Sequence, residues 1–366
     1  MRKLWIWLGL VVIGIAAALF FGRSRVETGT VNRPWPLGLG LVADAPKRFP
    51  VAKDSAGAVK LVELARKAGV DLVRDPDRYE PVDRGVRRAF TEYLRAQLER
   101  GSGEIDAPPS DVTRDLADHA AVFDEIKALA LSADPIVFAT DINKGEREAP
   151  GPHLLGLQHL HRVYVVRGLI AARDNKPEAW DELHVAWKLA APLWNRPESI
   201  SVMTASTAAR FINTAARKLP MPPAPWFQEV LSFPYDRALA AAHQAEAWRA
   251  KTAAHNVRVR GMAEEVLRAR ACDAKSEQFE AVRKKLGGRA TLSLVEAWER
   301  MMRFRAEREL TEKVFALRSG QTPSNATQCS DGTWEVTPAS IKFSRDVSVP
   351  EPQVKYALAY SRSAGK

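Results

Sequence analysis

The feature that most constrains this chain is a long uncharged apolar segment at residues 4–22. Two basic residues precede the segment and two arginines follow it closely. Nineteen helical residues span about 28 Å, which matches the hydrocarbon core of a bilayer. The segment contains no charged residue, no amide side chain and no proline. The sequence therefore predicts a transmembrane helix within residues 1–25.

Two interpretations of this segment remain open, an uncleaved signal anchor and a cleaved signal peptide. Alanines at 16–18 offer the small residues that a cleavage site needs. Cleavage there would leave Leu19, Phe20 and Phe21 at the new N-terminus, and the apolar run continues past the alanines. We therefore favour the uncleaved signal anchor.

The orientation of the anchor depends on the basic residues at its two ends. Arg2 and Lys3 face Arg23, Arg25 and Arg33, so the two counts are nearly equal. A short N-terminal tail inside and a large exported domain is the commoner bacterial arrangement. We expect a single-pass protein of the cell inner membrane with a periplasmic body.

The composition predicts a packed body with a basic surface. Hydrophobic residues make up 46% of the 366, which excludes a disordered stalk, and the net charge is +10. Between Trp248 and Arg318 the basic residues alternate with glutamates, a pattern typical of a solvated helix face with i,i+4 ion pairs. Contact with anionic lipid headgroups is the alternative interpretation, and a nucleic-acid partner is not expected.

Beyond the anchor, the pattern predicts a mainly α fold in three parts. Residues 26–55, rich in Pro and Gly, read as a linker with little regular structure. Residues 56–318 show helical periodicity and read as an all-α domain. Residues 319–366 contain alternating stretches at 333–337, 341–344 and 354–360 and read as a small β appendage. The expected helices cover about 59–69, 82–98, 110–129, 154–173, 178–192, 198–219, 234–271 and 292–317, with a shorter helix before the last.

Residues 157–197 resemble one helical hairpin of the tetratricopeptide (TPR) family. Small residues occupy Ala172 before the turn, and Ala179 and Ala186 seven apart in the second helix. Pro192 interrupts that helix, and no second copy follows at the family period of about 34 residues. The resemblance implies antiparallel helix pairs, and helical hairpins of this type mostly bind other proteins.

Two clusters of polar side chains are candidates for a catalytic or metal site. His159 and His161 point about 200° apart on a helix, so they cannot share one ion; we interpret them as one buried and one surface histidine, with His153 upstream. Asp141, Glu146 and Glu148 lie on a polar loop that offers no fixed pocket for acid–base work. No nucleophile, phosphate-loop or zinc motif is present in the sequence, and we expect neither a catalytic site, a metal nor a cofactor.

Three tryptophans recur every seven residues, at Trp180, Trp187 and Trp194. We interpret them as a bulky seam packed against the helix from 154 to 173; an aromatic platform for a glycan or peptide is the alternative. Trp194, beside Arg196, is the one expected to reach solvent. Trp194 and Arg196 are therefore the candidate partner-binding residues.

Cys272 and Cys329 could form one disulfide in an exported chain if their Cα atoms approach to about 4.4–6.8 Å.

Taken together, the sequence favours a membrane-anchored helical adaptor that binds another protein of the envelope. The alternatives are an envelope hydrolase that acts on cell-wall material with a site between helices, and a structural element whose β tail pairs with a partner strand.

Overall fold

The computed structural model describes residues 34–73, 84–101, 103–144, 151–249, 260–261, 263–286, 289–348 and 356–361. The predicted anchor at 4–22, together with Glu146 and Glu148, lies outside these ranges. Among the described residues no helix is both long enough and apolar enough to cross a bilayer.

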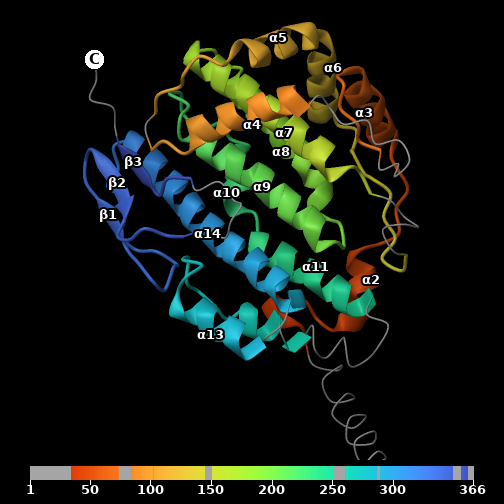
Figure 1. Ribbon diagram of the computed structural model, residues 1–366, viewed down its shortest axis with the longest axis vertical. Coiled ribbons are helices and arrows are strands. Elements are labelled where there is room, and N and C mark those ends of the chain that lie inside the picture. Colours follow the sequence, from red (N-terminus) through yellow and green to blue (C-terminus); the bar gives the residue numbers. More distant parts are fainter. Residues whose placement is uncertain are drawn as a thin grey trace, which may run out of the picture.

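The body is mainly helical with a small C-terminal sheet, as the sequence predicted (Figure 1). Its main helices are α3 (Ala56–Lys67), α4 (Arg84–Leu98), α5 (Ser110–Asp118), α6 (Ala120–Leu131), α7 (Leu154–Arg173), α8 (Ala179–Trp194), α9 (Ser199–Ala216), α10 (Phe227–Ser232), α11 (Tyr235–Arg249), α13 (Glu277–Leu286) and α14 (Arg289–Arg318). Short helical pieces precede them at η1 (Pro36–Gly38), η2 (Val42–Asp44) and α2 (Ala45–Arg48).

Helix α9 is the centre of the bundle. It packs against α7, α8, α11 and α14, and nearly all of its residues are buried. Its sequence is rich in Ala, Ser and Thr, whose small side chains let four neighbouring helices approach its backbone. Two of its buried hydroxyls donate within the helix itself: that of Thr204 to the carbonyl of Ile200 at 2.9 Å, and that of Ser206 to the carbonyl of Val202 at 2.8 Å. A polar helix can therefore occupy the core at little cost in unsatisfied groups.

Helices α7 and α8 are consecutive and pack closely along their length (Figure 1). Gly168 of α7 lies where a Cβ atom would come 3.2 Å from the carbonyl oxygen of Ala179 at the start of α8, so only a small residue fits. This is one hairpin; the TPR-like arrangement of the body as a whole stays a prediction. Pro192 lies inside α8, which ends two residues later, in agreement with the expected termination.

The stretch that follows residue 33 differs from the predicted linker. Residues 36–48 form η1, η2 and α2, and Trp35, Leu39 and Phe49 are buried in the core. The indole of Trp35 donates to the carbonyl of Ala240 in α11 at 3.1 Å. Prolines and glycines here shape tight turns, and the apolar residues between them bind the turns to the bundle.

The helix expected over 110–129 is two helices instead. α5 ends at Asp118 and α6 begins at Ala120, with His119 between them in a non-helical conformation. The His119 ring lies 3.1 Å from the carbonyl oxygen of Asp115, a local contact that competes with continuation of the helix. Neither Ser110 nor Asp111 caps α5, since Pro109 occupies the N-cap position.

The C-terminal sheet has the antiparallel order β1 (Trp334–Val336), β2 (Ser340–Phe343) and β3 (Ala359–Ser361). Trp334 pairs with Phe343, and Ile341 pairs with Tyr360. The sheet packs on α14, and the indole of Trp334 donates to Glu309 of that helix at 2.9 Å. The β segment is therefore joined to the helical body through a buried contact.

Candidate functional site

The two residues predicted to bind a partner are both buried. Trp194 is 5% exposed and packs against Trp187, Phe233 and Tyr235. Arg196 is 4% exposed and pairs with Glu198 at 3.0 Å. The expectation that Trp194 reaches solvent is wrong, because the chain around Phe233 and Tyr235 covers the end of α8. Binding of a partner through these two residues stays a prediction.

The other aromatic and histidine predictions have mixed outcomes. The seam of tryptophans is packed, but its ring contacts come from Trp226, Phe227 and Phe315 besides the residues that cover Trp194.

His159 and His161 are both buried, so the prediction that one of them lies on the surface is wrong. Burial lowers the pKa of His159 to about 3 and that of His161 to about 4. Both rings are therefore neutral parts of the core.

A serine, a histidine and a glutamate meet at the start of α9. The hydroxyl of Ser199 lies 2.9 Å from Nδ1 of His243, and Oε2 of Glu246 lies 3.6 Å from the same nitrogen. The carboxylate of Glu246 also accepts the backbone N–H of Ser199 at 3.2 Å. A triad would use the two ring nitrogens separately, one for the nucleophile and one for the carboxylate. Here both contacts use Nδ1, so the geometry fits a helix N-terminus capped from α11 better than it fits an activated nucleophile.

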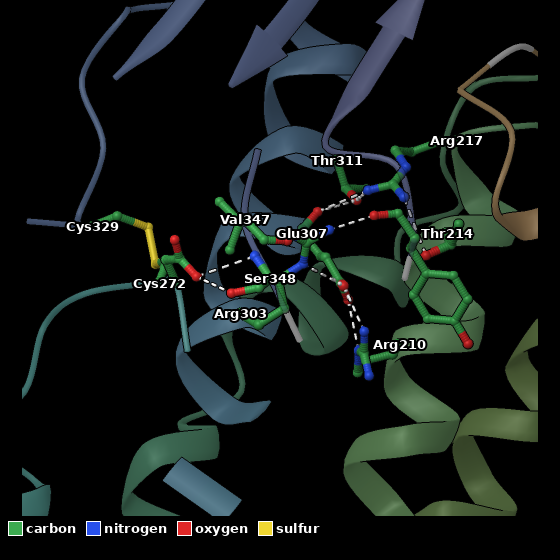
Figure 2. Close-up of polar contacts among 12 residues, drawn as sticks. Arg210, Thr214, Arg217, Cys272, Arg303, Glu307, Thr311, Cys329, Val347 and Ser348 are labelled. Atoms are coloured by element: carbon green, nitrogen blue, oxygen red, sulfur yellow. Dashed lines mark hydrogen bonds and ion pairs between the residues drawn. A yellow bond between two sulfur atoms is a disulfide. The ribbon is translucent and has the colours of Figure 1, made fainter. Parts of the chain in front are cut away.

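A buried polar cluster is centred on Glu307 of α14 (Figure 2). Arg210 of α9 binds both carboxylate oxygens, at 2.8 and 2.7 Å, and Arg303 lies 3.2 Å from one of them. Arg217 donates to the backbone carbonyl of Glu307 at 3.0 Å. Burial opposes ionisation of Glu307, but the attraction of the arginines outweighs it and holds its pKa below the usual value. The cluster fixes α9 to α14.

The same cluster holds the C-terminal segment in place. Arg303 donates to the carbonyl of Val347 at 3.0 Å and to that of Tyr356. Nearby, the carboxylate of Asp273 accepts the backbone N–H of Ser348 at 3.1 Å and also the hydroxyl of Ser348. Val347, Ser348 and Tyr356, which lie between β2 and β3, are therefore bound by charged groups from two separate parts of the body.

Cys272 and Cys329 form a disulfide, with their Cα atoms 5.4 Å apart (Figure 2). It links the stretch before α13 to the stretch before β1. Asp331 accepts the backbone N–H groups of Cys272 and Asp273 at 2.9 and 3.0 Å. The two sulfurs and a carboxylate oxygen of Asp331 lie within 4.8 Å of one another, but sulfurs joined to each other are not the thiolates that bind metals. This group is a covalent cross-link.

A hollow with a volume of about 490 Å³ lies at the start of the described chain. We call it the basic hollow. One side consists of Pro34, Pro36 and Leu37. The other side consists of Arg260, Glu264, Leu267, Arg268 and Arg270. Figure 1 shows the first described residues, in red, at the lower edge of the molecule near α11 and α13.

The arginines of the basic hollow have different roles. Arg260 is 4% exposed; it pairs with Glu264 at 2.9 Å and donates to the carbonyl of Pro34 at 3.1 Å. It therefore joins the two sides of the hollow. Arg268 has 72% of its side chain exposed and lies 3.5 Å from Glu265, while Arg270 is exposed and donates to the carbonyl of Leu267 at 2.8 Å. With one glutamate among three arginines, the lining carries a net positive charge.

Sequence reasoning missed this hollow because its two sides are 226 residues apart in the chain. The signal that was available is the mixed-charge stretch after Trp248, in which the predicted i,i+4 pairing is confirmed for Arg260 and Glu264. Pairing of this kind accounts for part of the basic excess, and Arg268 and Arg270 remain as exposed cations.

Comparison with family models, curated proteins and solved structures finds no match to this chain. Function is therefore inferred from the chemistry of the described residues. Among them, the basic hollow is the feature that best combines space, charge and access.

Proposed function

We propose that this chain is a single-pass envelope protein of the inner membrane whose periplasmic helical body binds another component of the envelope. The apolar segment at 4–22 would hold it in the bilayer. The body begins only a short distance along the chain, since Trp35 is already part of the core.

The observation that carries the proposal is the disulfide between Cys272 and Cys329. Disulfides persist in oxidising compartments such as the periplasm and are rare in the cytosol. The cross-link therefore supports export of the body, which the nearly equal charge counts around the anchor left open. A periplasmic body restricts its partners to envelope proteins, lipids and cell-wall material.

A binding role is favoured over catalysis by the packing of the body. The core is filled, and the hollow of about 490 Å³ is lined by arginines, prolines and leucines with one glutamate. A general acid–base pair needs two titratable groups that converge on a substrate. The described part of this hollow offers a single carboxylate beside three cations.

Crosslinking in intact cells followed by purification of the full chain tests the adaptor role. One dominant crosslinked protein is expected. Recovery of no reproducible partner would contradict the adaptor role.

An envelope hydrolase remains the second candidate, because Ser199 lies within hydrogen-bond distance of His243. If Ser199 were a nucleophile, Ser199→Ala would abolish hydrolysis of cell-wall material and leave the fold intact. If Ser199 and Glu246 only cap α9, the same variant costs a small amount of stability and changes no activity.

A further inference from the structure

We propose that the basic hollow binds the phosphate of an anionic phospholipid headgroup in the bilayer that anchors the chain. The inference rests on the proposed function, because it requires the anchor at residues 4–22. It adds a specific partner for the hollow, the membrane itself, and a role for the hollow in fixing the orientation of the body.

The position of the hollow in the chain places it near the bilayer. Pro34, one of its lining residues, follows residue 22 by only twelve positions. Twelve residues span at most about 40 Å when fully extended and less in any turn. The hollow therefore lies within a short reach of the headgroups whichever path the connecting residues take.

The charge of the hollow matches a phosphate. Guanidinium groups bind phosphate oxygens through paired N–H donors, and they keep their charge at any physiological pH. Arg260 is committed to Glu264 and to the carbonyl of Pro34. Arg268 is 72% exposed although it lies 3.5 Å from Glu265, and Arg270 is exposed although it donates to the carbonyl of Leu267. Their remaining N–H groups are the donors for an incoming anion.

The remaining lining suits the rest of a lipid headgroup. Pro36, Leu37 and Leu267 offer apolar surface beside the arginines, where the glycerol and the first methylenes of a lipid can pack. The volume of about 490 Å³ is in the range of small-molecule sites. A headgroup at the end of a lipid can enter such a hollow, whereas the strands of a nucleic acid duplex cannot.

One exposed tryptophan supports the same orientation. Trp248, 38% exposed, lies one helical turn after Gln244 on α11. Gln244 donates to the carbonyls of Leu39 and Leu41, which belong to the stretch that forms the hollow. Tryptophan is enriched at the interface between membrane and water, where its ring is apolar and its N–H is solvated. Leu41, whose carbonyl Gln244 binds, is also exposed.

Hydrogen exchange of the full chain in nanodiscs tests the proposal. Phosphatidylglycerol replaces phosphatidylcholine in steps, and the exchange of backbone amides at 34–39 and 263–270 is followed. Exchange at both stretches should slow as the phosphatidylglycerol fraction rises. Arg268→Gln should raise the fraction needed for half the effect about 5-fold, since one basic residue near an anionic surface contributes about that factor. Adding Arg270→Gln should raise it further.

The control variant is Arg66→Gln with Lys67→Gln, which removes two exposed cations from the end of α3. It should behave as the wild type. A melting curve of each variant shows whether it is folded, and because Arg268 is exposed, its single substitution should leave the melting temperature unchanged.

The outcomes separate the headgroup site from the anchor. A chain that stays in the discs but exchanges equally at every lipid composition overturns the headgroup site and leaves the anchor intact. A chain that does not co-purify with discs of either lipid overturns both. Equal protection by inorganic phosphate in neutral discs, or protection by an acidic peptide alone, would assign the hollow to a soluble ligand or a protein partner and overturn the lipid.

Discussion

Arg210 and Glu307 form a two-point ion pair between α9 and α14, with both contacts shorter than 3 Å and neither side chain more than 5% exposed. The pair joins the central helix to the longest one, and through Arg303 it also reaches the C-terminal segment. Breaking a buried pair leaves the remaining charges without a counter-ion, so this contact should be among the most sensitive in the body.

Glu307→Gln should therefore lower the free energy of unfolding by about 3–5 kcal/mol. Three arginines would then lie in or beside the core with no carboxylate among them. The matched control is Glu296→Gln on the same helix, whose contact with Arg300 is longer, at 3.7 Å, and partly exposed. The control should cost less than about 1 kcal/mol. Denaturant unfolding measures both, and equal effects would contradict the assigned role of Glu307.

The disulfide should contribute about 4 kcal/mol, because the cross-linked residues are 57 positions apart and the bond restricts the unfolded chain. Cys329→Ser should lower the midpoint of unfolding accordingly, and a reducing agent should do the same to the wild type but not to the variant. Unchanged stability of the reduced wild type would show that Arg303 and Asp273 suffice to hold the C-terminal segment.

Acid should destabilise the body through His159 and His161. Their pKa values are lowered to about 3 and about 4 in the folded chain, whereas histidines of the unfolded chain take up protons below about pH 6.5. Stability is therefore fully present above pH 6.5 and falls below it, by up to about 1.4 kcal/mol per pH unit for each histidine. His161→Phe should flatten this slope over pH 4–6.5.

Protonation of Glu299 has the opposite effect on stability: it stabilises the folded chain as the pH falls. Burial raises its pKa to about 7 in spite of the nearby Arg283, so the folded chain holds a proton there that the unfolded chain loses above pH 4.5. Its contribution to stability grows as the pH falls from 7 to 4.5. Comparing His161→Phe with the wild type at each pH cancels this contribution. An unchanged slope would show that His161 does not limit stability in acid.

Trp194→Ala should cost about 3–5 kcal/mol, as for other large core aromatics. Trp248→Ala is the comparison: because that ring is 38% exposed, its truncation removes less buried apolar area and should cost less than Trp194→Ala. Thermal unfolding in detergent compares the two. Similar losses would contradict the burial of Trp194 beneath Phe233 and Tyr235.

Local periodicity was enough to predict most elements of the fold. The helices α7 and α14 and the strands β1 and β2 lie close to their predicted positions, since apolar spacing and turn residues are encoded over a few neighbouring positions. The third strand, β3 at 359–361, overlaps only the end of the stretch expected at 354–360. The break at His119 was missed because the apolar pattern continues across it. The helical turns of residues 36–48 were not predicted, because the apolar residues there are buried by α11, which lies about 200 positions further along the chain.

The candidate site could not be predicted for a similar reason. Heptad spacing placed Trp180, Trp187 and Trp194 on one face but could not show which residues cover that face. The basic hollow depends on a contact between Pro34 and Arg260, and no local pattern encodes contacts over such separations. The sequence offers Cys272 and Cys329 only as a possible pair, because the distance between them in the fold determines whether the disulfide forms.

The central claim, a body held on the periplasmic side of the inner membrane, is tested most directly by topology mapping with reporters fused after Lys366. We expect an active alkaline phosphatase fusion, a dark green fluorescent protein fusion, and a disulfide between Cys272 and Cys329 in cells. A fluorescent fusion with inactive phosphatase and free thiols at both cysteines would place the body in the cytosol and contradict the account.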